Sequence, residues 1–434
     1  MFNKILSAAV LTALSFVSIA GPVTTEKSGI DSIVVFGDSL SDNGNTAQLL
    51  KSLRQVDDPS FLVAPLKTFV FRKMDDFAND YYVPTPVLLA GKQLAREFFD
   101  VELAPLLSSV VAVIKTVPII PESPYWHYHF SDGKVWNESL ATDLGLNLKD
   151  PDQYYNNAYG GSWASTYDYQ LTTWNIIRHP VLSITNLLQG KLIPPSLGLE
   201  ITAYLLNFGE AQPDKTYFIF AGSNDYLNML NFEDNYNPVN MSSYVKHVVD
   251  GILYSSERLI LAGAKKVVMF GVPDIGITPN YRDSMDHDFI SKACTWHNER
   301  LKEGIDAIRA KYPEVKITFI NTQEVFTDLF SKAASYGITN TTEACVDLPL
   351  PGFAFTKQAP SHKAFGYNFV LEYTQYLKTP NGFGGFTNNF NTCAKPNSYA
   401  FWDVIHPTAA AHKALGKTVC GLLKDDGYGI KCKS

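Results

Sequence analysis

The chain has 434 residues, of which 46% are hydrophobic and 18% are charged, and its formal net charge at pH 7 is −7. This is an ordinary globular composition. The acidic balance argues against a nucleic-acid partner and against a general electrostatic attraction to anionic membranes. No repeat, low-complexity tract or Pro/Gly/Ser-rich linker divides the sequence. We therefore expect one folded domain, although just over 400 residues is long for a single domain.

The first twenty residues have the pattern of a secretion signal. Lys4 provides the charged start, residues 5–19 are apolar with small residues among them, and Ser18-Ile19-Ala20 is a small-x-small cleavage site. The apolar run is too short for a membrane anchor. We therefore expect residues 1–20 to be a signal peptide and residues 21–434 to be secreted into the extracellular space.

The next feature is a set of short apolar runs that predict buried strands. Helical spacing over residues 244–261 and 290–310 precedes two of these runs, which indicates an α/β fold with a parallel sheet and helices on both faces. Ligands of such sheets bind at the carboxyl ends of the strands, where Ser39 and Asn224 both fall. The predicted strands are Ile33–Phe36, Tyr217–Ala221, Lys266–Phe270 and Lys316–Ile320.

A serine follows the first predicted strand, and an Asp-x-x-His pair stands near the end of the chain. Ser39 lies in Gly37-Asp38-Ser39 at a strand-to-helix corner, and Asp403 stands three residues before His406. A serine nucleophile, an imidazole base and an orienting carboxylate are the minimum set for acyl transfer through a serine ester. Each motif alone is weak, because Gly-Asp-Ser between an apolar run and polar residues is most often a turn.

Two further segments, Asn156–Ser162 and Phe218–Asp225, lie between these motifs. The four segments, in this order, resemble the blocks of the GDSL lipases, also called SGNH hydrolases. The resemblance extends from about residue 30 to about residue 423 and implies a flavodoxin-like SGNH-hydrolase sheet carrying long insertions. The departures from the family pattern are small, namely Asn157 in place of an aromatic residue and Ser162 in place of alanine.

The resemblance also implies roles for five residues. Ser39 is expected to be the nucleophile, with Asp403 and His406 completing the catalytic triad. The backbone N–H groups of Ser39 and Gly160 and the side-chain amide of Asn224 are expected to form the oxyanion hole. No cofactor and no metal are expected for this chemistry.

The block spacing and residues 341–345 resemble the secreted bacterial phospholipases A and glycerophospholipid:cholesterol acyltransferases of the family. This resemblance implies phospholipid and lysophospholipid substrates, water or cholesterol as acyl acceptor, and transient contact with a membrane surface. Two alternatives stay open. A broad carboxylesterase or carbohydrate deacetylase on the same triad would prefer short acyl chains. A catalytically silent secreted binding protein is disfavoured because all five expected catalytic positions are intact.

Two apolar stretches, near residues 51–125 and 181–206, are surplus to a minimal fold of this kind. The first contains the almost uncharged run 101–120, and the second is rich in leucine, isoleucine and proline. They are either additional core packing or an apolar acyl-chain groove or membrane-touching cap beside the serine.

Five cysteines lie in the last third of the chain, and in an exported protein disulfides are the default. We expect the pairs Cys345–Cys393 and Cys420–Cys432, with Cys294 as a buried thiol in a helix. The first pair would bracket the loop 346–392, which is rich in proline, glycine and aromatic residues. We expect this loop to gate the site, so that cleavage within it by an activating protease raises activity toward long-chain lipids.

Two other groups resemble functional sites more weakly. His127 and His129 have an i, i+2 spacing that suits a metal, but solvated loop histidines are the expected interpretation. The Asp286-His287-Asp288 sequence contains a rival dyad, and its polar surroundings near a helix start favour a surface turn instead.

Overall fold

A computed structural model describes most of the catalytic region of the sequence, in the ranges 29–55, 82–97, 123–165, 195–229, 238–346 and 391–432, with isolated positions between 67 and 79 and residue 121. The expected signal peptide 1–20, much of the 51–125 stretch, residues 181–194 and nearly all of the 346–392 loop lie outside the described residues. The expectations for those segments therefore stay predictions.

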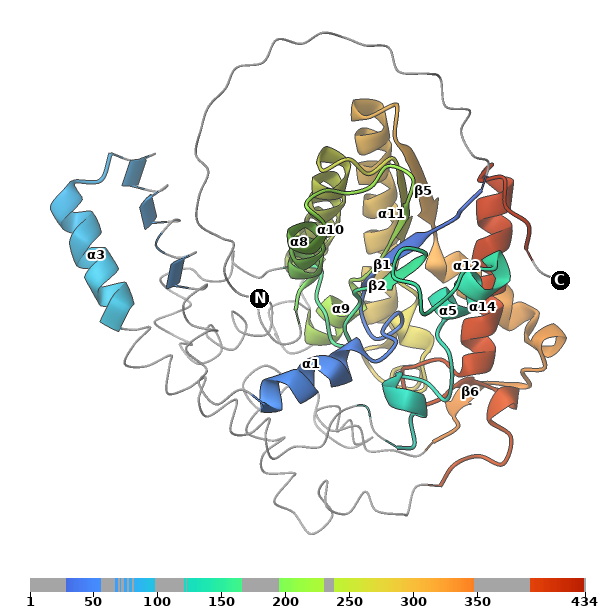
Figure 1. Ribbon diagram of the computed structural model, residues 1–434. Coiled ribbons are helices and arrows are strands. Elements are labelled where there is room, and N and C mark those ends of the chain that lie inside the picture. The colour runs from blue at the N-terminus through green and yellow to red at the C-terminus, as the bar shows by residue number, and fades with distance from the viewer. Residues whose placement is uncertain are drawn as a thin grey trace, which may run out of the picture.

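The core of the molecule is a five-stranded parallel sheet in the order β2-β1-β3-β4-β5 (Figure 1). This is the strand order of flavodoxin-like folds, so the predicted α/β fold is confirmed. The four predicted strands all form, and the edge strand β2 was missed because its three residues, Tyr-Tyr-Asn, make no apolar run. The strands are β1 (Ile33–Gly37), β2 (Tyr154–Asn156), β3 (Thr216–Phe220), β4 (Lys266–Phe270) and β5 (Lys316–Ile320).

Alternate residues of each central strand point to opposite faces of the sheet. In β1, Val34 and Phe36 belong to one hydrophobic cluster, and Ile33 and Val35 belong to another. Because helices cover both faces, every residue of β1 and β3 is buried. This two-sided burial is the reason that these strands are continuous apolar runs in the sequence.

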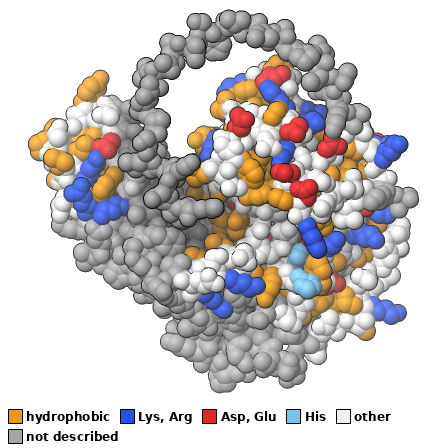
Figure 2. All heavy atoms as spheres, viewed as in Figure 1, with side chains coloured by type: hydrophobic (Ala, Val, Ile, Leu, Met, Phe, Trp, Pro, Cys, Tyr) orange, Lys and Arg blue, Asp and Glu red, His pale blue; other side chains and the backbone are white. Residues whose placement is uncertain are grey.

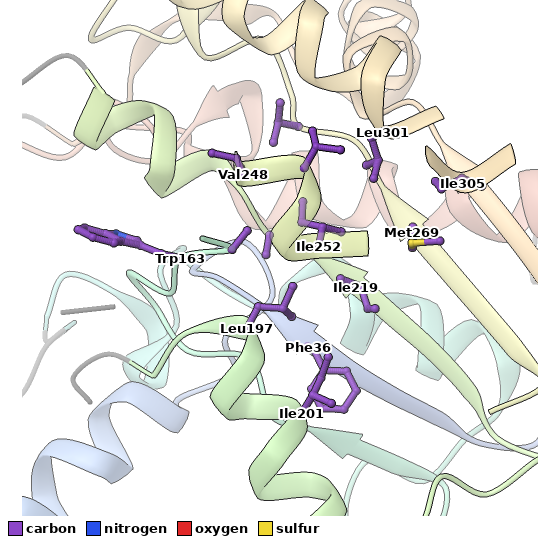
Figure 3. Packing of buried hydrophobic residues seen from close by; sticks show 14 of the residues in the cluster. Phe36, Trp163, Leu197, Ile201, Ile219, Val248, Ile252, Met269, Leu301 and Ile305 are labelled. Atoms are coloured by element: carbon purple, nitrogen blue, oxygen red, sulfur yellow. The ribbon is translucent and has the colours of Figure 1, made fainter. Parts of the chain in front are cut away.

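Helices cover both faces of the sheet (Figure 1). The first cluster joins the sheet to α8 (Leu197–Phe208), α10 (Pro238–Leu261) and α11 (His287–Lys311), and Figure 3 shows Leu197, Ile252 and Leu301 of these helices around Phe36 and Ile219. The second cluster joins the sheet to α5 (Trp136–Leu144), α12 (Thr322–Ser331) and α14 (Ala409–Asp425). Within the apolar stretch 181–206, the structure describes the residues from 195 onward, and most of these belong to α8. This helix contributes Leu197, Ile201 and Tyr204 to the core.

The remaining described elements lie around this three-layer core. They are α1 (Asn45–Arg54), α3 (Thr85–Glu97), the 3-10 helix η2 (Trp126–Tyr128), α9 (Ser223–Met229), the 3-10 helices η5 (Ile275–Ile277), η6 (Ala333–Tyr336) and η8 (Pro396–Ser398), and the strands β6 (Asn340–Ala344) and β7 (Tyr399–Phe401). None of the helices that the structure describes is both long and apolar enough to cross a membrane. Figure 2 shows acidic and basic side chains intermixed over the outer surface near α10 and α11.

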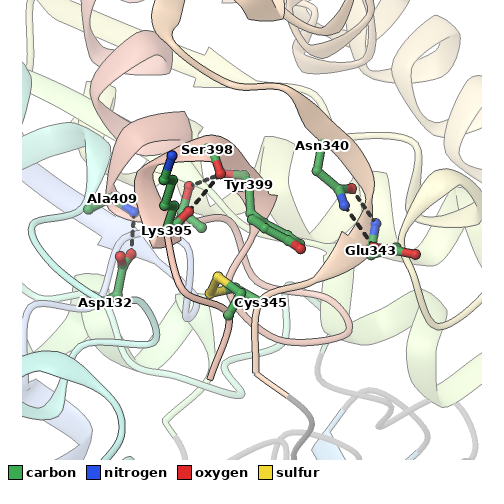
Figure 4. Close-up of a disulfide and its surroundings, with 10 residues drawn as sticks. Asp132, Asn340, Glu343, Cys345, Lys395, Ser398, Tyr399 and Ala409 are labelled. Carbon is green, nitrogen blue, oxygen red and sulfur yellow. Dashed lines mark hydrogen bonds between the residues drawn. A yellow bond between two sulfur atoms is a disulfide. The ribbon is translucent and has the colours of Figure 1, made fainter. Parts of the chain in front are cut away.

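Both expected disulfides are present. Cys345–Cys393 joins the end of β6 to the segment that leads into β7 (Figure 4), and Cys420–Cys432 ties the C-terminal segment to α14. Cys294 is a buried free thiol on α11, as expected. Strands β6 and β7 pair in parallel beside the first disulfide, and β7 leads directly to Asp403 and His406.

Candidate active site

The structure brings Ser39, His406 and Asp403 into one chain of hydrogen bonds. Ser39 stands just past the end of β1, and the other two residues follow β7. The Ser39 Oγ lies 2.9 Å from His406 Nε2, and His406 Nδ1 lies 2.7 Å from Asp403 Oδ2. All three side chains are buried, with Asp403 fully inaccessible. A serine and its base are therefore within proton-transfer distance although 367 positions separate them.

The electrostatics of Asp403 determine the tautomer of the histidine. Burial by itself raises the pKa of Asp403, but His406 and the backbone N–H groups of Ile405 and His406 outweigh it and hold that pKa below its usual value. An ionised Asp403 only accepts hydrogen bonds, so His406 Nδ1–H donates to it. The Nε2 atom of His406 is then free to accept the Ser39 hydroxyl proton.

The side chain of Asp42 ties the serine turn to the glycine turn at residues 160–161. Asp42 Oδ1 accepts the backbone N–H groups of Gly44 and Asn45, and Oδ2 accepts the N–H of Gly160 at 2.9 Å. Thr46 Oγ1 is a second acceptor for the Gly160 N–H, at 2.7 Å. The Gly160 N–H, expected to face a substrate, is therefore engaged inside the protein.

Close packing favours glycine at residue 160, and residue 161 has the backbone conformation that favours glycine. A Cβ on Gly160 would come within 2.1 Å of the Phe130 ring, which lies against His406 with 5.2 Å between ring centroids. Gly161 has a φ of 82°. Its N–H finds no hydrogen-bond partner among the described residues, and the same holds for the N–H of Ser39.

Asn224 and Asp225 begin α9 at the carboxyl end of β3. Asn224 Nδ2 donates to the carbonyl oxygen of Ser162 at 2.9 Å, which leaves the second hydrogen of this amide available. The fully buried Asp225 accepts the N–H groups of Ala164 and Ser165 at 2.9 and 3.0 Å. These contacts hold the glycine turn against the start of α9.

An apolar pocket opens beside Ser39 and His406. The space between its lining residues amounts to about 610 Å³ when its open mouth is included. Asn224 and Asp274 are among the polar residues in its wall. The apolar lining comes from Leu40, Leu227, Ile275, Ile277, Phe326, Phe330, Phe401 and Ile405.

The weaker candidate sites are separate from this pocket. The expectation of a solvated loop histidine is wrong for His129, because its side chain is buried and its Nε2 lies 2.9 Å from Glu138. His287 is the first residue of α11, next to its N-terminal cap Asp286, which agrees with a turn at a helix start. Within the described ranges, no group of three or more His, Cys, Asp or Glu side chains is arranged to hold a metal ion.

Four residues around the site were not identified from the sequence: Asp42, Asp225, Glu200 and Tyr125. Asp225 is the last residue of the segment Phe218–Asp225, and the turn sequence Asp42-Asn43-Gly44 was a usable signal for Asp42. Glu200 accepts the N–H of Gly37 at 2.8 Å, and Tyr125 donates to Asp403 at 2.8 Å. Neither contact has a local sequence signal, because the partners are 163 and 278 positions apart.

The strand order of the sheet is that of an SGNH-type hydrolase, and so is a Ser–His–Asp arrangement whose serine follows β1. A sequence profile of the GDSL-like lipase/acylhydrolase family matches residues 33–419. The chain belongs to this family of lipolytic enzymes.

Three bacterial relatives illustrate the range of the family. A phosphatidylcholine-sterol acyltransferase of Aeromonas hydrophila is 25% identical over 69% of this chain and 81% of its own length. The secreted effector protein SseJ of Salmonella typhimurium is 24% identical over 69% of this chain and 56% of its own length. The thermolabile hemolysin of Vibrio parahaemolyticus is 24% identical over 67% of this chain and 54% of its own length. The chain thus spans only about half the length of the last two.

Proposed function

We propose that the protein is a secreted serine lipolytic enzyme, a phospholipase A and lysophospholipase that also transfers the acyl group to cholesterol. The observation that carries the proposal is the position of Ser39 Oγ, 2.9 Å from His406 Nε2 and in the wall of an apolar pocket. A nucleophile and base beside a mainly apolar pocket suit an ester whose acyl part is a hydrocarbon chain.

The first half of the proposed reaction forms an acyl-serine. His406 Nε2 takes the Ser39 hydroxyl proton as Ser39 Oγ attacks the ester carbonyl, and Asp403 stabilises the imidazolium that results. The tetrahedral intermediate collapses with cleavage of the ester C–O bond. His406 returns its proton to the departing alkoxide, which leaves as a lysophospholipid or a glycerophospho-alcohol.

The second half transfers the acyl group to an acceptor hydroxyl. His406 takes a proton from water or from the cholesterol hydroxyl, and the acceptor oxygen attacks the acyl-serine carbonyl. Collapse releases a fatty acid or a sterol ester and returns the proton to Ser39. Exclusion of water from the pocket favours the sterol product. The Aeromonas relative, which is named a phosphatidylcholine-sterol acyltransferase, supports sterol as an acceptor.

The oxyanion requires donors that are already aimed at the carbonyl oxygen. We assign the Ser39 N–H and the free Nδ2 hydrogen of Asn224 to this role. The third donor comes from the glycine turn. The expected Gly160 N–H must first leave Asp42 and Thr46, whereas the Gly161 N–H has no partner among the residues that the structure describes, so we favour Gly161 for this role.

The proposal includes export as a single domain with insertions. The two disulfides are typical of proteins that fold in an oxidising compartment, and the charged start and small-x-small site of residues 1–20 have the pattern of a signal peptide. We retain an activating protease as a candidate partner, because Cys345–Cys393 would hold together the two parts of a chain that is cleaved within the loop 346–392.

Lipid product analysis tests this function directly. The purified protein is incubated with phosphatidylcholine vesicles with and without cholesterol, and fatty acid, lysophospholipid and sterol ester are quantified. We expect all three products, and none from Ser39→Ala, while the exposed-site control Ser243→Ala retains full activity. Free fatty acid alone would leave a plain phospholipase. Activity confined to short-chain esters would indicate a carboxylesterase or carbohydrate deacetylase, and failure of a fluorophosphonate to label Ser39 would indicate a binding protein.

A further inference from the structure

Tyr125 contacts the same carboxylate oxygen that holds His406. The Tyr125 hydroxyl donates to Asp403 Oδ2 at 2.8 Å, and His406 Nδ1 lies 2.7 Å from that atom. Burial, followed by the charge of Asp403, raises the pKa of Tyr125 well above its usual value, so the hydroxyl stays protonated and acts as a donor.

Among the described residues, Tyr125 is the one donor to this carboxylate from outside the turn at 403–406. The other oxygen, Asp403 Oδ1, accepts the backbone N–H groups of Ile405 and His406 at 2.8 and 2.7 Å. Both of these donors belong to the same turn as Asp403, so their hydrogen bonds do not fix the carboxylate relative to the rest of the protein. The Tyr125 bond therefore ties the carboxylate to a separate part of the chain, 278 positions away.

Aromatic packing holds the Tyr125 ring in place. The ring lies edge-on to Trp402, with 6.5 Å between centroids, and edge-on to Phe130, with 6.4 Å between centroids. Trp402 packs with Cys345 of the disulfide, and Phe130 lies against His406. Tyr125 thus occupies a defined position between the disulfide-braced segment and the imidazole.

We propose that Tyr125 is a positioning residue for the acyl-transfer reaction, fixing the Asp403 carboxylate and moderating its effect on His406. The inference rests on the proposed function of the Ser39–His406–Asp403 arrangement. A hydrogen bond from Tyr125 draws negative charge away from Oδ2, so the carboxylate stabilises the imidazolium less than it would alone. It also restricts rotation of the carboxylate, so the imidazole stays aimed at Ser39.

The substitution Tyr125→Phe removes the hydroxyl and keeps the ring. We expect kcat on a soluble ester to fall about 10-fold with KM unchanged, similar to the loss when an outer partner of a metal-bound histidine is removed. The acid limb of the kcat/KM profile should move to higher pH, because Oδ2 then interacts with the imidazolium alone. Asp38 and His412 also act electrostatically on His406 and are unchanged in this variant.

The matched control is Tyr128→Phe, in the same segment. Its hydroxyl has no hydrogen-bond partner among the described residues, and its ring packs under Lys51 instead. We expect its kcat and pH profile to equal those of the wild type. The downfield proton resonance of His406 Nδ1–H gives a readout independent of turnover, and it should move in Tyr125→Phe and not in Tyr128→Phe.

A double-mutant cycle with Asp403→Asn separates positioning from general structural support. If Tyr125 acts through Asp403, Tyr125→Phe lowers kcat no further in the Asp403→Asn background. Equal losses in both backgrounds, or a wild-type pH profile and proton resonance in Tyr125→Phe, would overturn the inference. A different result would overturn the proposed function itself, namely that Ser39→Ala retains activity on the ester.

Discussion

Glu200 Oε2 accepts the backbone N–H of Gly37 at 2.8 Å, which links α8 to the last residue of β1, two positions before Ser39. Asn157 Nδ2 donates to the Glu200 carbonyl oxygen at 2.7 Å, so the same residue also holds the start of the glycine turn segment. Glu200 is buried, with 1% of its surface exposed. Burial, together with the charges of Asp38 and Asp42, raises the pKa of this side chain well above its usual value, which favours the neutral carboxylic acid.

Glu200→Gln and Glu200→Leu should therefore behave differently. Glutamine is neutral and keeps an acceptor for the Gly37 N–H, so we expect its stability and turnover to stay near those of the wild type. Leucine leaves a buried N–H unpaired, which costs about 1–3 kcal/mol. Urea unfolding at pH 7 measures the stability of each of the two variants. Equal destabilisation by the two substitutions would show that Glu200 is ionised in the folded protein.

Asn224→Ala tests the proposed oxyanion hole. An oxyanion donor acts mainly in the transition state, so we expect turnover to fall about 100-fold or more with a much smaller change in KM. The variant also loses the bond to the Ser162 carbonyl oxygen, so its melting temperature must be measured alongside the kinetics. A large rise in KM at normal turnover would make Asn224 a substrate-binding residue instead.

The apolar pocket is the proposed acyl-chain site, and Ile277 in its wall is only partly buried. Ile277→Trp narrows the pocket without disturbing the core. Each methylene kept out of an apolar site loses about 0.8 kcal/mol, so activity on a long-chain ester should fall at least about 10-fold relative to a short-chain ester. The control Ile277→Val should preserve the ratio. An unchanged ratio in the tryptophan variant would place the acyl chain elsewhere.

Asp38 makes the free energy of unfolding depend on pH. Burial raises its pKa from 3.8 to about 7, so the folded state binds a proton that the unfolded chain releases between about pH 4 and pH 7. Stability from this group is therefore full below about pH 4 and is lost as the pH rises through 7.

Asp38→Asn removes that contribution. Between pH 4.5 and pH 7.5 the wild type should lose about 3 kcal/mol more unfolding free energy than the variant does. Urea titrations at the two pH values check this, with the exposed Asp152→Asn as the matched control. Parallel pH dependence of the wild type and Asp38→Asn would contradict the prediction.

The two disulfides should stabilise the fold by different amounts. Cys345–Cys393 spans 48 positions and Cys420–Cys432 spans 12. Loop-closure entropy then predicts losses of about 4 and about 3 kcal/mol when each pair is replaced by alanine. Denaturant unfolding of the two double-alanine variants shows which disulfide contributes more to the free energy of unfolding. A larger loss on removal of Cys420–Cys432, which closes the shorter loop, would show that chain entropy does not dominate.

Local sequence was sufficient for several parts of this protein. The buried strands β1, β3, β4 and β5 are continuous apolar runs because helices cover both faces of the sheet. Ser39 and Asn224 follow two of these strands directly, and the Asp-x-x-His spacing puts Asp403 and His406 in one turn. Chain order and strand direction therefore predicted which residues meet at the edge of the sheet, and the family resemblance supplied their expected roles.

Tertiary structure decided what short-range patterns do not encode. The strand β2 forms because a parallel neighbour supplies its hydrogen bonds, and His129 is buried because Glu138 faces it. In the glycine turn, Asp42 from a distant segment accepts the N–H of Gly160, whereas the N–H of Gly161 has no hydrogen-bond partner within the described part of the chain.

Tertiary structure also decided two hydrogen bonds beside the site, the one between Tyr125 and Asp403 and the one between Glu200 and Gly37. A hydrogen bond between residues 278 or 163 positions apart leaves no periodicity in the chain, because neither partner requires the other for its local conformation. The sequence alone thus predicted the four apolar strands of the sheet and the two cysteine pairs, and the family resemblance supplied the expected reacting groups. The packing of the sheet and its surrounding segments decided how those groups are held, since their hydrogen bonds to distant residues depend on orientation in space.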